Sequence, residues 1–525
     1  MLIPTLPDRQ PFHSRRMHWM NMLDLHATDR PDEIAVTTEA ENISWSELHR
    51  RVQAMAADLQ RNRGVQSGDR VLILALNSAE YLAAMVAINT VGAISVPVNV
   101  RSVPRELDYF ISDSGAKAIY VDAMGAEILA GTEHKDQVQA ISFVDDVPDI
   151  LAAEGRPEWL DIDENAIAMI MYTSGTTSAP KGVMLSYLNL LSQTIPIFRA
   201  APAPGELPEA NLIVVPMFHI AGVGFLTPAF FAATRLVIAP PKVLTNISAL
   251  ADMLEREQIT TMFLVPTIWQ ALCSLPGIKD RDIPLQSISW GASPASKETL
   301  QLMADTFPNA TISAAFGQTE MSPVTAQLQG PDSLRKMGSI GQTIGPVAAR
   351  IVDAQGNDVP QGEMGEIVYR GPGFMAGYWN KEEATEESTH DGWFHSGDMV
   401  RQDEEGYMYV VDRTKDLIIS GGENISSIEV EHAVAGHPKV ADASVVGAPH
   451  EKWVETPVAI VVPADPSDPP TLEEIQDYLS DKLASFKKPT RLEVVDELPR
   501  NASGKLLKHK MRAQYAADYS TSTTN

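Results

Sequence analysis

The chain has 525 residues, and its 41 Lys and Arg against 68 Asp and Glu give a formal net charge of −27. Strong acidity repels polyanions, which disfavours duplex nucleic acid and anionic membrane surfaces as partners. The single cysteine, Cys273, excludes an internal disulfide and a cysteine-based metal centre, so we expect it to be a small buried apolar residue.

The first regular elements alternate between strand and helix. Residues 70–76 are apolar and predict a buried strand, residues 79–90 predict a helix, and residues 93–98 predict a second strand. This rhythm is typical of a largely parallel sheet covered by helices. At about 150 residues per domain, the length allows about two to four folding units.

One uncharged segment, residues 212–234, is long enough to cross a bilayer. Pro216, His219 and Pro228 would interrupt a spanning helix, so we expect a buried strand, a loop and a helix instead. The basic N-terminal residues precede no apolar stretch, which argues against a signal peptide. The sequence therefore predicts a soluble, cytoplasmic protein without a transmembrane segment.

A domain boundary is predicted after the strand-like residues 406–411. The expected fold class is α/β, with a large N-terminal domain of several subdomains, built on mixed and parallel sheets, and a small mobile C-terminal α/β domain. The expected borders are 1–412 for the large domain, 413–416 for a hinge and 417–525 for the small domain.

The predicted small domain has short, regular elements. Capping boxes begin at Ser426 and Thr471 and predict two helices. Strands are expected at residues 440–446, 457–462 and 492–495. Residues 482–512 hold nine basic and three acidic residues, a net charge of +6. That strip is either a solvated basic face or a contact for a polyanionic small molecule.

The strongest motif is the segment 172–182, with sequence YTSGTTSAPKG, which follows an apolar strand-like run. Hydroxyl groups, small residues and exposed backbone N–H groups can surround phosphate oxygens, and a lysine adds a positive charge. A Walker A loop has Gly before its Lys, whereas Pro180 precedes Lys181 here. The segment therefore predicts a phosphate-binding loop of another type.

Seven further short motifs follow one another along the chain. They are PMFH at 216–219, FGQTE at 316–320, GE at 365–366, HSGD at 395–398, DRTKD at 412–416, SGGEN at 420–424 and PRNASGK at 499–505. Together with the loop, they resemble the adenylate-forming enzymes, which include acyl-CoA synthetases, firefly-type luciferases and peptide-synthetase adenylation domains. The resemblance extends from about residue 24 to residue 512.

The resemblance implies an ATP-dependent, AMP-forming carboxylic acid–CoA ligase. ATP would convert the acid to an acyl-adenylate with release of pyrophosphate, and the thiol of coenzyme A would then displace AMP. Both steps gather negative charge, so cations and N–H donors must be directed there. The implied cofactors and co-substrates are ATP, Mg²⁺ and coenzyme A, with a small-molecule acid as the other partner; a homodimer is compatible with the sequence.

The resemblance also implies roles for individual residues. Glu320 would coordinate Mg²⁺, since a carboxylate suits this hard cation. Thr319 would bind the α-phosphate, and Phe316, next to Ala315, would lie against the adenine face. Asp398 and Arg413 would reach the ribose. The implied ligands of the β- and γ-phosphates are Thr173, Ser174, Gly175, Thr176, Thr177 and Lys181.

Two half-reactions on one site imply a domain motion. Lys415 matches the family's hinge, Lys505 would approach the carboxylate and α-phosphate for adenylation, and the turn that contains Gly422 would then face the thiol channel. Lys505→Ala should therefore lose adenylation but keep thioester formation from supplied acyl-AMP.

His219 stands in an apolar segment, where a lone histidine is usually a hydrogen-bonded core residue. By resemblance it lines the acyl site. Peptide-synthetase adenylation domains commonly have Asp there, so Phe218-His219 argues against an α-amino acid substrate. The apolar and small residues at 212–233 and 291–293 predict an apolar pocket.

Several functional readings stay open. A medium- or long-chain fatty acid is favoured as substrate, with an aryl or small branched acid as the alternative. An acyl-adenylating enzyme that loads a carrier protein in trans is a second possibility. A nucleotide-binding scaffold without turnover is a third.

Overall fold

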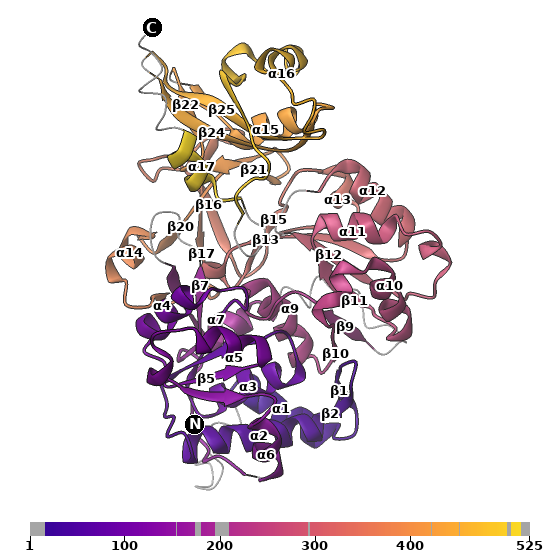
Figure 1. Ribbon diagram of the computed structural model, residues 1–525, viewed down its shortest axis with the longest axis vertical. Coiled ribbons are helices and arrows are strands. Elements are labelled where there is room, and N and C mark those ends of the chain that lie inside the picture. Colours follow the sequence, from indigo (N-terminus) through magenta and orange to yellow (C-terminus); the bar gives the residue numbers. More distant parts are fainter. Residues whose placement is uncertain are drawn as a thin grey trace, which may run out of the picture. The chain divides into compact units, whose positions relative to one another are not determined.

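The computed structural model describes residues 16–153, 155–173, 180–194, 209–291, 295–421, 423–450, 452–500 and 506–515. The chain forms two compact units. Figure 1 shows the helices and strands with their labels, coloured by residue number. Unit 1 contains the described residues of 16–348 and 369–394, and unit 2 those of 349–368 and 395–515. The mixture of helices with parallel and antiparallel strands confirms the predicted α/β fold class.

The first sheet of unit 1 has the order β18–β8–β7–β4–β3–β5–β6. Strands β7, β4, β3, β5 and β6 are parallel, whereas β8 and β18 are antiparallel to their neighbours. The strands are β3 (Arg70–Leu74), β4 (Ile94–Pro97), β5 (Ala118–Val121), β6 (Gln139–Ser142), β7 (Ile167–Thr173), β8 (Lys181–Ser186) and β18 (Gly377–Tyr378).

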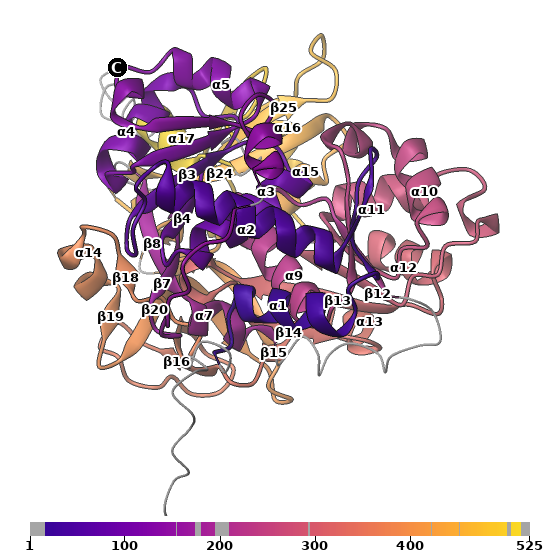
Figure 2. The ribbon, with the colours of Figure 1, turned by 90° about the horizontal axis from the view of Figure 1, so that it is seen from below.

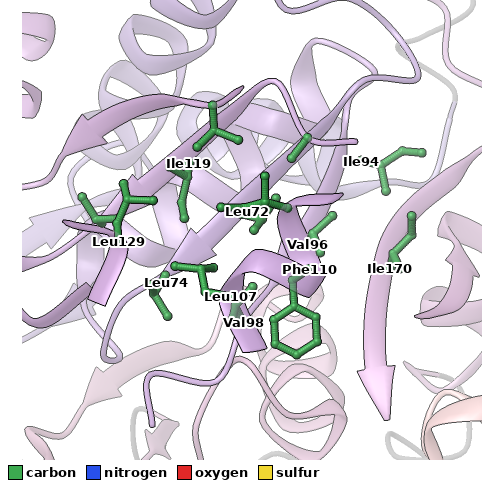
Figure 3. Close-up of a cluster of buried hydrophobic side chains, with 14 residues drawn as sticks. Leu72, Leu74, Ile94, Val96, Val98, Leu107, Phe110, Ile119, Leu129 and Ile170 are labelled. Carbon is green, nitrogen blue, oxygen red and sulfur yellow. The ribbon is translucent and has the colours of Figure 1, made fainter. Parts of the chain in front are cut away.

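The predicted strand–helix–strand segment is confirmed as β3, α3 (Ala79–Thr90) and β4. Helix α3 begins where the Ser78 side chain accepts a hydrogen bond from the backbone N–H of Tyr81. It is buried on nearly all sides, as expected for a helix without a polar face. Figure 3 shows how Leu72, Leu74 and Val96 pack against residues of α4 (Pro104–Ser114) in the sheet's core.

The second sheet of unit 1 has the order β15–β14–β13–β12–β11–β9–β10–β1–β2. Neighbouring strands from β13 to β1 are parallel, so their carboxyl ends meet at one edge. The strands are β1 (Ile34–Thr37), β2 (Asn42–Ser44), β9 (Ala210–Ile213), β10 (Arg235–Ile238), β11 (Thr261–Leu264), β12 (Ser287–Gly291), β13 (Thr311–Gly317), β14 (Val324–Gln329) and β15 (Gln342–Thr343).

The uncharged segment 212–234 forms the end of β9, a loop and helix α9 (Ile220–Phe231), as predicted. Across the described residues, no helix is both long enough and apolar enough to span a membrane. Cys273 ends helix α11 (Pro266–Cys273) and is 4% exposed, which confirms its prediction as a buried residue. Burial raises the pKa of its thiol to about 11.

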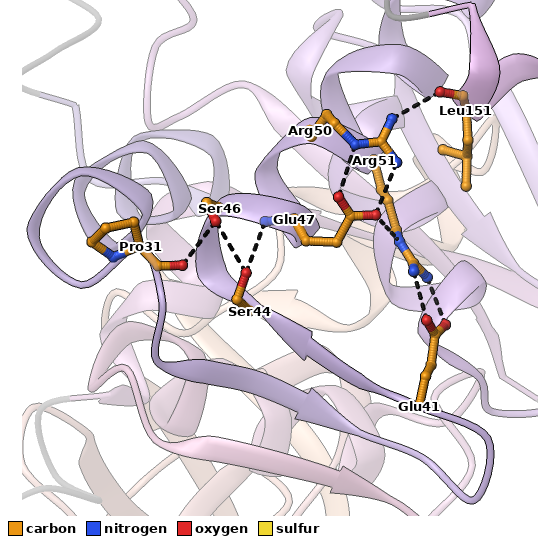
Figure 4. A network of polar contacts seen from close by, with 8 residues as sticks. All are labelled: Pro31, Glu41, Ser44, Ser46, Glu47, Arg50, Arg51 and Leu151. Atoms are coloured by element: carbon orange, nitrogen blue, oxygen red, sulfur yellow. Dashed lines mark hydrogen bonds and ion pairs between the residues drawn. The ribbon is translucent and has the colours of Figure 1, made fainter.

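Two N-terminal helices, α1 (Trp19–Asp29) and α2 (Trp45–Arg61), pack together, and α2 also packs on α3; Figure 2 shows this group from below. The start of α2 is fixed by polar contacts (Figure 4). Ser44 accepts from the backbone N–H of Glu47, and the Glu47 carboxylate accepts from Arg50 and Arg51. The hydrogen bond from Arg50 lowers the pKa of Glu47 to about 2.

Other helices complete unit 1. They are α5 (Ala123–Ala130), α6 (Val147–Ala152), α7 (Tyr187–Ser192), α10 (Ile247–Arg256), α12 (Lys297–Thr306), α13 (Asp332–Arg335) and α14 (Glu382–Glu387).

Two further sheets consist mainly of residues of unit 2, although the short strand β19 (Thr389–His390) falls in the segment 369–394 of unit 1. One has the order β16–β17–β20–β19 with β21 also on β20, and the other has the order β23–β22–β25–β24 with β26 on β25. Their strands are β16 (Ala348–Val352), β17 (Met364–Arg370), β19 (Thr389–His390), β20 (Trp393–Gln402), β21 (Met408–Arg413), β22 (Ile418–Ser420), β23 (Glu423–Ile425), β24 (Val440–His450), β25 (Val454–Pro463) and β26 (Arg491–Val494).

The helices of unit 2 are α15 (Ser427–Ala435), α16 (Leu472–Tyr478) and α17 (Lys508–Tyr515). The predicted capping box of α16 is present, since Thr471 and Glu474 exchange side-chain and backbone hydrogen bonds. At α15 Ser426 caps the helix, and the Glu429 carboxylate accepts from Lys487. Residues 395–412 belong to the same compact unit as the C-terminal elements, so the domain borders predicted at 412 and 416 stay a prediction.

Candidate active site

The predicted phosphate loop joins two paired strands of unit 1. Thr173 ends β7, Lys181 begins β8, and the two residues lie opposite each other in the ladder. The Thr173 hydroxyl lies 3.5 Å from the carbonyl oxygen of Lys181. The strand pairing therefore brings the first and last predicted phosphate ligands together. Ser174, Gly175, Thr176 and Thr177 lie outside the described residues.

Lys181 and Glu320 are connected through Tyr378, a residue that the sequence reasoning missed. The Tyr378 hydroxyl donates to Oε1 of Glu320 at 3.0 Å, and Lys181 Nζ lies 4.9 Å from the centroid of the Tyr378 ring. Burial, with Glu320 as the second cause, raises the pKa of Tyr378, so its hydroxyl stays a donor at neutral pH.

The position of Tyr378 follows from the pairing of β18 with β8. Tyr378 lies opposite Val183, and Lys181 is two residues before Val183, so all three side chains share one face of the sheet. The backbone N–H of Met375 donates to the Glu320 carbonyl oxygen at 2.9 Å, which joins the same segment to Glu320. Strand β18 has two residues, too few for a periodic sequence pattern, so nothing local indicated it.

The predicted adenine and α-phosphate residues follow the end of β13. Ala315 and Phe316 are half-buried near its carboxyl end, and Thr319 and Glu320 begin the short helix η5 (Thr319–Met321). Gly317 is required between them, because a Cβ there would collide with the carbonyl oxygen of Pro323. In parallel sheets this edge is where ligands usually bind.

His219 lies at the same edge, after β9, and it is exposed. Its Nδ1 accepts from the backbone N–H of Ala221 at 3.2 Å and so caps helix α9. The general expectation of a core histidine is therefore wrong for this residue. The exposed position is compatible with a place on the wall of the acyl site.

The small residues predicted to line an apolar pocket are packed closely. A Cβ at Gly222 would collide with the Pro216 carbonyl oxygen, and one at Gly224 would lie 2.6 Å from Pro323 Cγ. A Cβ at Gly291 would lie 2.5 Å from the Ala315 carbonyl oxygen. These glycines thus allow close approach of neighbouring segments rather than opening space.

An aromatic pair lies beside these closely packed glycines. The rings of Phe225 on α9 and Phe263 on β11 have centroids 4.8 Å apart and are tilted by 42°. Phe263 also lies 3.3 Å from the position that a Cβ of Gly291 would occupy. The segments around these glycines are therefore closely packed, and two aromatic rings lie next to them.

A cavity of about 240 Å³ elsewhere in unit 1 contains none of the predicted site residues. Three of its lining residues are Glu39, Glu41 and Glu80. Glu39 pairs with Lys242 and Glu41 with Arg51, so these carboxylates are largely neutralised.

The two residues predicted to reach the ribose are an ion pair in unit 2. Asp398 on β20 and Arg413 on β21 lie opposite each other, and Arg413 Nε is 2.7 Å from Asp398 Oδ1. The Asp398 side chain is 4% exposed and that of Arg413 is 35% exposed. Arg413 is therefore the more accessible partner.

The turn before Asp398 is held by Glu366 on β17. Its carboxylate accepts from the backbone N–H of Gly397 at 2.8 Å and lies 2.8 Å from His395 Nδ1. The two motifs at 365–366 and 395–398 are thus one structural feature.

Lys415 is exposed in the turn that follows β21. The next residue, Asp416, pairs with Arg512 of α17. Lys505 and Gly422 lie outside the described residues.

The basic strip at 482–512 is largely neutralised within unit 2. Its ion pairs are Lys482–Asp481, Lys487–Glu429, Arg491–Glu493, Arg500–Asp442, Lys508–Glu431 and Arg512–Asp416. The charge offered to a polyanion is therefore smaller than the sequence total suggested.

Comparison with known proteins identifies the family. The AMP-binding enzyme model matches residues 23–379, and the AMP-binding enzyme C-terminal domain matches residues 429–505. A feruloyl-CoA synthase from Amycolatopsis sp. is 35% identical, with 92% of this chain and 96% of that protein covered. A fatty acid–[acyl-carrier-protein] ligase from Streptomyces coeruleorubidus is 31% identical, with 96% and 98% covered.

A solved structure is similar over nearly the whole chain. The o-succinylbenzoate CoA synthetase from Bacillus subtilis, in complex with its acyl-adenylate intermediate, has a TM-score of 0.82 and 30% identity, with 94% of this chain and 98% of that chain covered. The same enzyme has been solved with ATP and a magnesium ion. The chain therefore belongs to the AMP-binding enzyme family, within the adenylate-forming superfamily of ligases.

Proposed function

We propose that this ligase activates a compact aryl carboxylic acid as its acyl-AMP and then transfers the acyl group to coenzyme A. The observation that carries the proposal is the similarity over 92% of the chain to a feruloyl-CoA synthase, a ligase named for an aryl acid. The solved relative from Bacillus subtilis is likewise named for an aryl acid.

The packing beside β12 supports a compact acid. At Gly222, Gly224 and Gly291 neighbouring atoms fill the space that a side chain would take, so an acyl group there would meet closely packed segments. The Phe225–Phe263 pair offers ring faces and edges, which favour contact with an aryl group. A medium- or long-chain fatty acid is the alternative substrate.

In the first half-reaction, the acid's carboxylate oxygen would attack the α-phosphorus of ATP and release pyrophosphate. Thr173 and Lys181 would bind the β- and γ-phosphates at the end of the β7–β8 hairpin, and Thr319 would bind the α-phosphate. Arg413, paired with Asp398, would hold the ribose. Fixed donors and cations of this kind stabilise the charge that gathers on the phosphates.

Glu320 fits a magnesium site that is completed by phosphate oxygens. Mg²⁺ is commonly bound by one or two carboxylates together with substrate phosphates and water. Glu320 supplies one carboxylate, and among the described residues there is no cluster of three or more acidic, histidine or cysteine ligands. A bound Mg²⁺ would neutralise phosphate charge during adenylation.

In the second half-reaction, the sulfur of coenzyme A would attack the acyl carbon and AMP would leave. Lys505 would serve only the first half-reaction, and rotation about Lys415 would replace it with the turn at 420–424. This alternation excludes water from the acyl-adenylate between the steps.

A panel of acids tests the substrate proposal. Ferulate, cinnamate, benzoate, 2-succinylbenzoate, hexanoate and palmitate would each be assayed for AMP release and for acyl-CoA formation. We expect an aryl acid to give the highest kcat/KM, and preference for palmitate over every aryl acid would contradict the proposal.

The acceptor is tested in the same assay. A second candidate, transfer to a carrier protein, is favoured by the similarity to the fatty acid–[acyl-carrier-protein] ligase. We expect AMP release and acyl-CoA in equal amounts, whereas AMP release without an acyl-CoA product would favour the carrier.

A further inference from the structure

We propose that Tyr109 and Asp113, both on helix α4, are positioning residues that hold the two ends of the loop between Thr173 and Lys181. The inference rests on the proposed role of that loop in binding the ATP phosphates. Neither residue belongs to a motif of the loop, and about sixty to seventy residues separate them from it in the sequence.

The upstream end of the loop is fixed by Asp113. Tyr172, which precedes Thr173 on β7, donates from its hydroxyl to Asp113 Oδ2 at 2.7 Å. The Tyr172 ring packs on Phe110, with centroids 4.7 Å apart, so the side chain is held at both its ring and its hydroxyl. Burial and the hydrogen bond to Asp113 raise the pKa of Tyr172, which keeps the hydroxyl protonated.

The downstream end is fixed by Tyr109. Its hydroxyl donates to the carbonyl oxygen of Pro180 at 2.8 Å, and Asp113 Oδ1 lies 3.2 Å from the same hydroxyl. A tyrosine hydroxyl has one proton, and Pro180 is the nearer acceptor. Tyr109 and Asp113 are four residues apart on one helical face, so a single surface of α4 contacts both ends of the loop.

The end of α4 is itself tied to the segment that carries Tyr378. The carbonyl oxygen of Asp113 accepts from Trp379 Nε1 at 3.0 Å and from Asn380 Nδ2 at 3.3 Å. Arg70 donates to the Ser114 carbonyl oxygen at 2.6 Å, and its guanidinium lies 5.0 Å from the Trp379 ring centroid. These side chains satisfy carbonyl groups that a helix end leaves without partners.

The arrangement has a consequence for ATP binding. Helix α4 is held in the core by Leu107, Phe110 and Ile111, so it is a rigid support for the loop. Fixing Tyr172 and Pro180 also fixes their neighbours Thr173 and Lys181, so these two proposed phosphate ligands need less ordering when ATP binds. Loss of the support should therefore weaken the use of ATP but not the use of the acid or of acyl-AMP.

The test measures the two half-reactions separately in Tyr109→Phe, Asp113→Ala and Asp113→Asn. ATP–pyrophosphate exchange reports adenylation, and acyl-CoA formation from supplied acyl-AMP reports the second step. Since a lost hydrogen bond changes an equilibrium constant by roughly 3- to 10-fold, we expect KM for ATP to rise about 3- to 10-fold in Tyr109→Phe and Asp113→Ala. KM for the acid and the acyl-AMP step should stay within about 2-fold of wild type, and Asp113→Asn should recover part of the loss because its amide oxygen still accepts from Tyr172.

The matched control is Tyr187→Phe, which removes another tyrosine hydroxyl of unit 1, one that donates to the Asn89 carbonyl oxygen at 3.2 Å. It should leave the ratio of the two half-reactions unchanged. If Tyr109→Phe and Asp113→Ala lower both half-reactions equally, or leave KM for ATP unchanged, the inference is wrong. The variant Lys181→Ala distinguishes failure of this inference from failure of the proposed role of the loop. An unchanged KM for ATP in Lys181→Ala would overturn the proposed role of the loop itself.

Discussion

The hydroxyl of Tyr378 donates to Oε1 of Glu320 at 3.0 Å, although 58 residues separate them in the sequence. Glu320 lies in a short helix after β13 of one sheet, and Tyr378 lies in a two-residue strand of the other. The contact therefore joins the two sheets of unit 1 at the proposed magnesium ligand. It leaves the second carboxylate oxygen, Oε2, for a further partner.

Tyr378→Phe should weaken the use of Mg²⁺. The variant removes the hydrogen bond that orients Glu320 but keeps the ring that faces Lys181. A hydrogen bond to a charged group contributes about 1.5–3 kcal/mol, so we expect the Mg²⁺ concentration for half-maximal adenylation to rise at least about tenfold. The measurement is ATP–pyrophosphate exchange against Mg²⁺ at saturating acid. An unchanged Mg²⁺ dependence, with a lower maximal rate, would contradict the role of Tyr378 in orienting Glu320.

Removing Arg413 alone should destabilise the protein more than removing the charges of both Arg413 and Asp398. Arg413→Ala leaves the buried Asp398 carboxylate without its cation, and we expect a loss of about 1–3 kcal/mol in the free energy of unfolding. Asp398→Asn in the same background removes the stranded charge and should recover part of that loss. Urea unfolding of the two single variants and the double variant measures the coupling. Strictly additive effects would show that the pair contributes no interaction energy.

Local signals in the sequence were enough to predict helices and strands whose ends are fixed by their own or adjacent residues. Helix α3 was predicted with its observed ends, Ala79 and Thr90, and its cap, Ser78, is the residue directly before it. The capping box at Thr471 and the phosphate-loop strand were likewise predictable from neighbouring residues.

Contacts between distant segments could not be predicted from one sequence. Tyr378 reaches Glu320 and Lys181 only because β18 pairs with β8, nearly two hundred residues earlier. Gly222, Gly224 and Gly291 were interpreted as lining a pocket, since a sequence does not show which backbone approaches a glycine. The net charge of +6 for the strip at 482–512 was counted correctly, but its ion-pair partners, such as Glu429 and Asp442, come from other elements and could not be predicted.

His26 makes stability depend on pH. It is 5% exposed, its Nε2 lies 2.9 Å from the Phe230 carbonyl oxygen, and burial is the main cause that lowers its pKa. The unfolded chain therefore takes up a proton near pH 6.5 while the folded chain does not, so the free energy of unfolding falls as the pH falls below about 6.5.

The variant His26→Gln tests this dependence. Glutamine can still donate to Phe230 but does not titrate, so we expect the variant to lose less stability between pH 7.5 and pH 5.5. The slopes should differ by at most about 1.4 kcal/mol per pH unit, the limit for one proton. Urea unfolding at each pH provides the measurement. Identical slopes in the variant and the wild type would mean that other groups cause the acid sensitivity.

The predicted hinge can be tested through contacts that cross it. Asp412 Oδ2 accepts from the backbone N–H of Ser427, and the Ser426 hydroxyl donates to the Val411 carbonyl oxygen; both join β21 to α15 across residues 413–416. A rotation about Lys415 must break both contacts, so weakening one should change the balance between the two half-reactions. Ser426→Gly removes the contact to Val411, and glycine at a helix N-cap costs only a few tenths of a kcal/mol.

We expect Ser426→Gly to change the ratio of the adenylation rate to the thioester-forming rate by about 5-fold, the effect of one hydrogen bond. Thr471→Gly is the matched control, because Thr471 caps α16 in the same unit and its hydroxyl bonds only to Glu474 among the contacts found for it. The control should leave the ratio unchanged, since both orientations of the small domain keep that cap. If Ser426→Gly also leaves the ratio unchanged, the contacts between β21 and α15 persist through the cycle, and the pivot is not at residues 413–416.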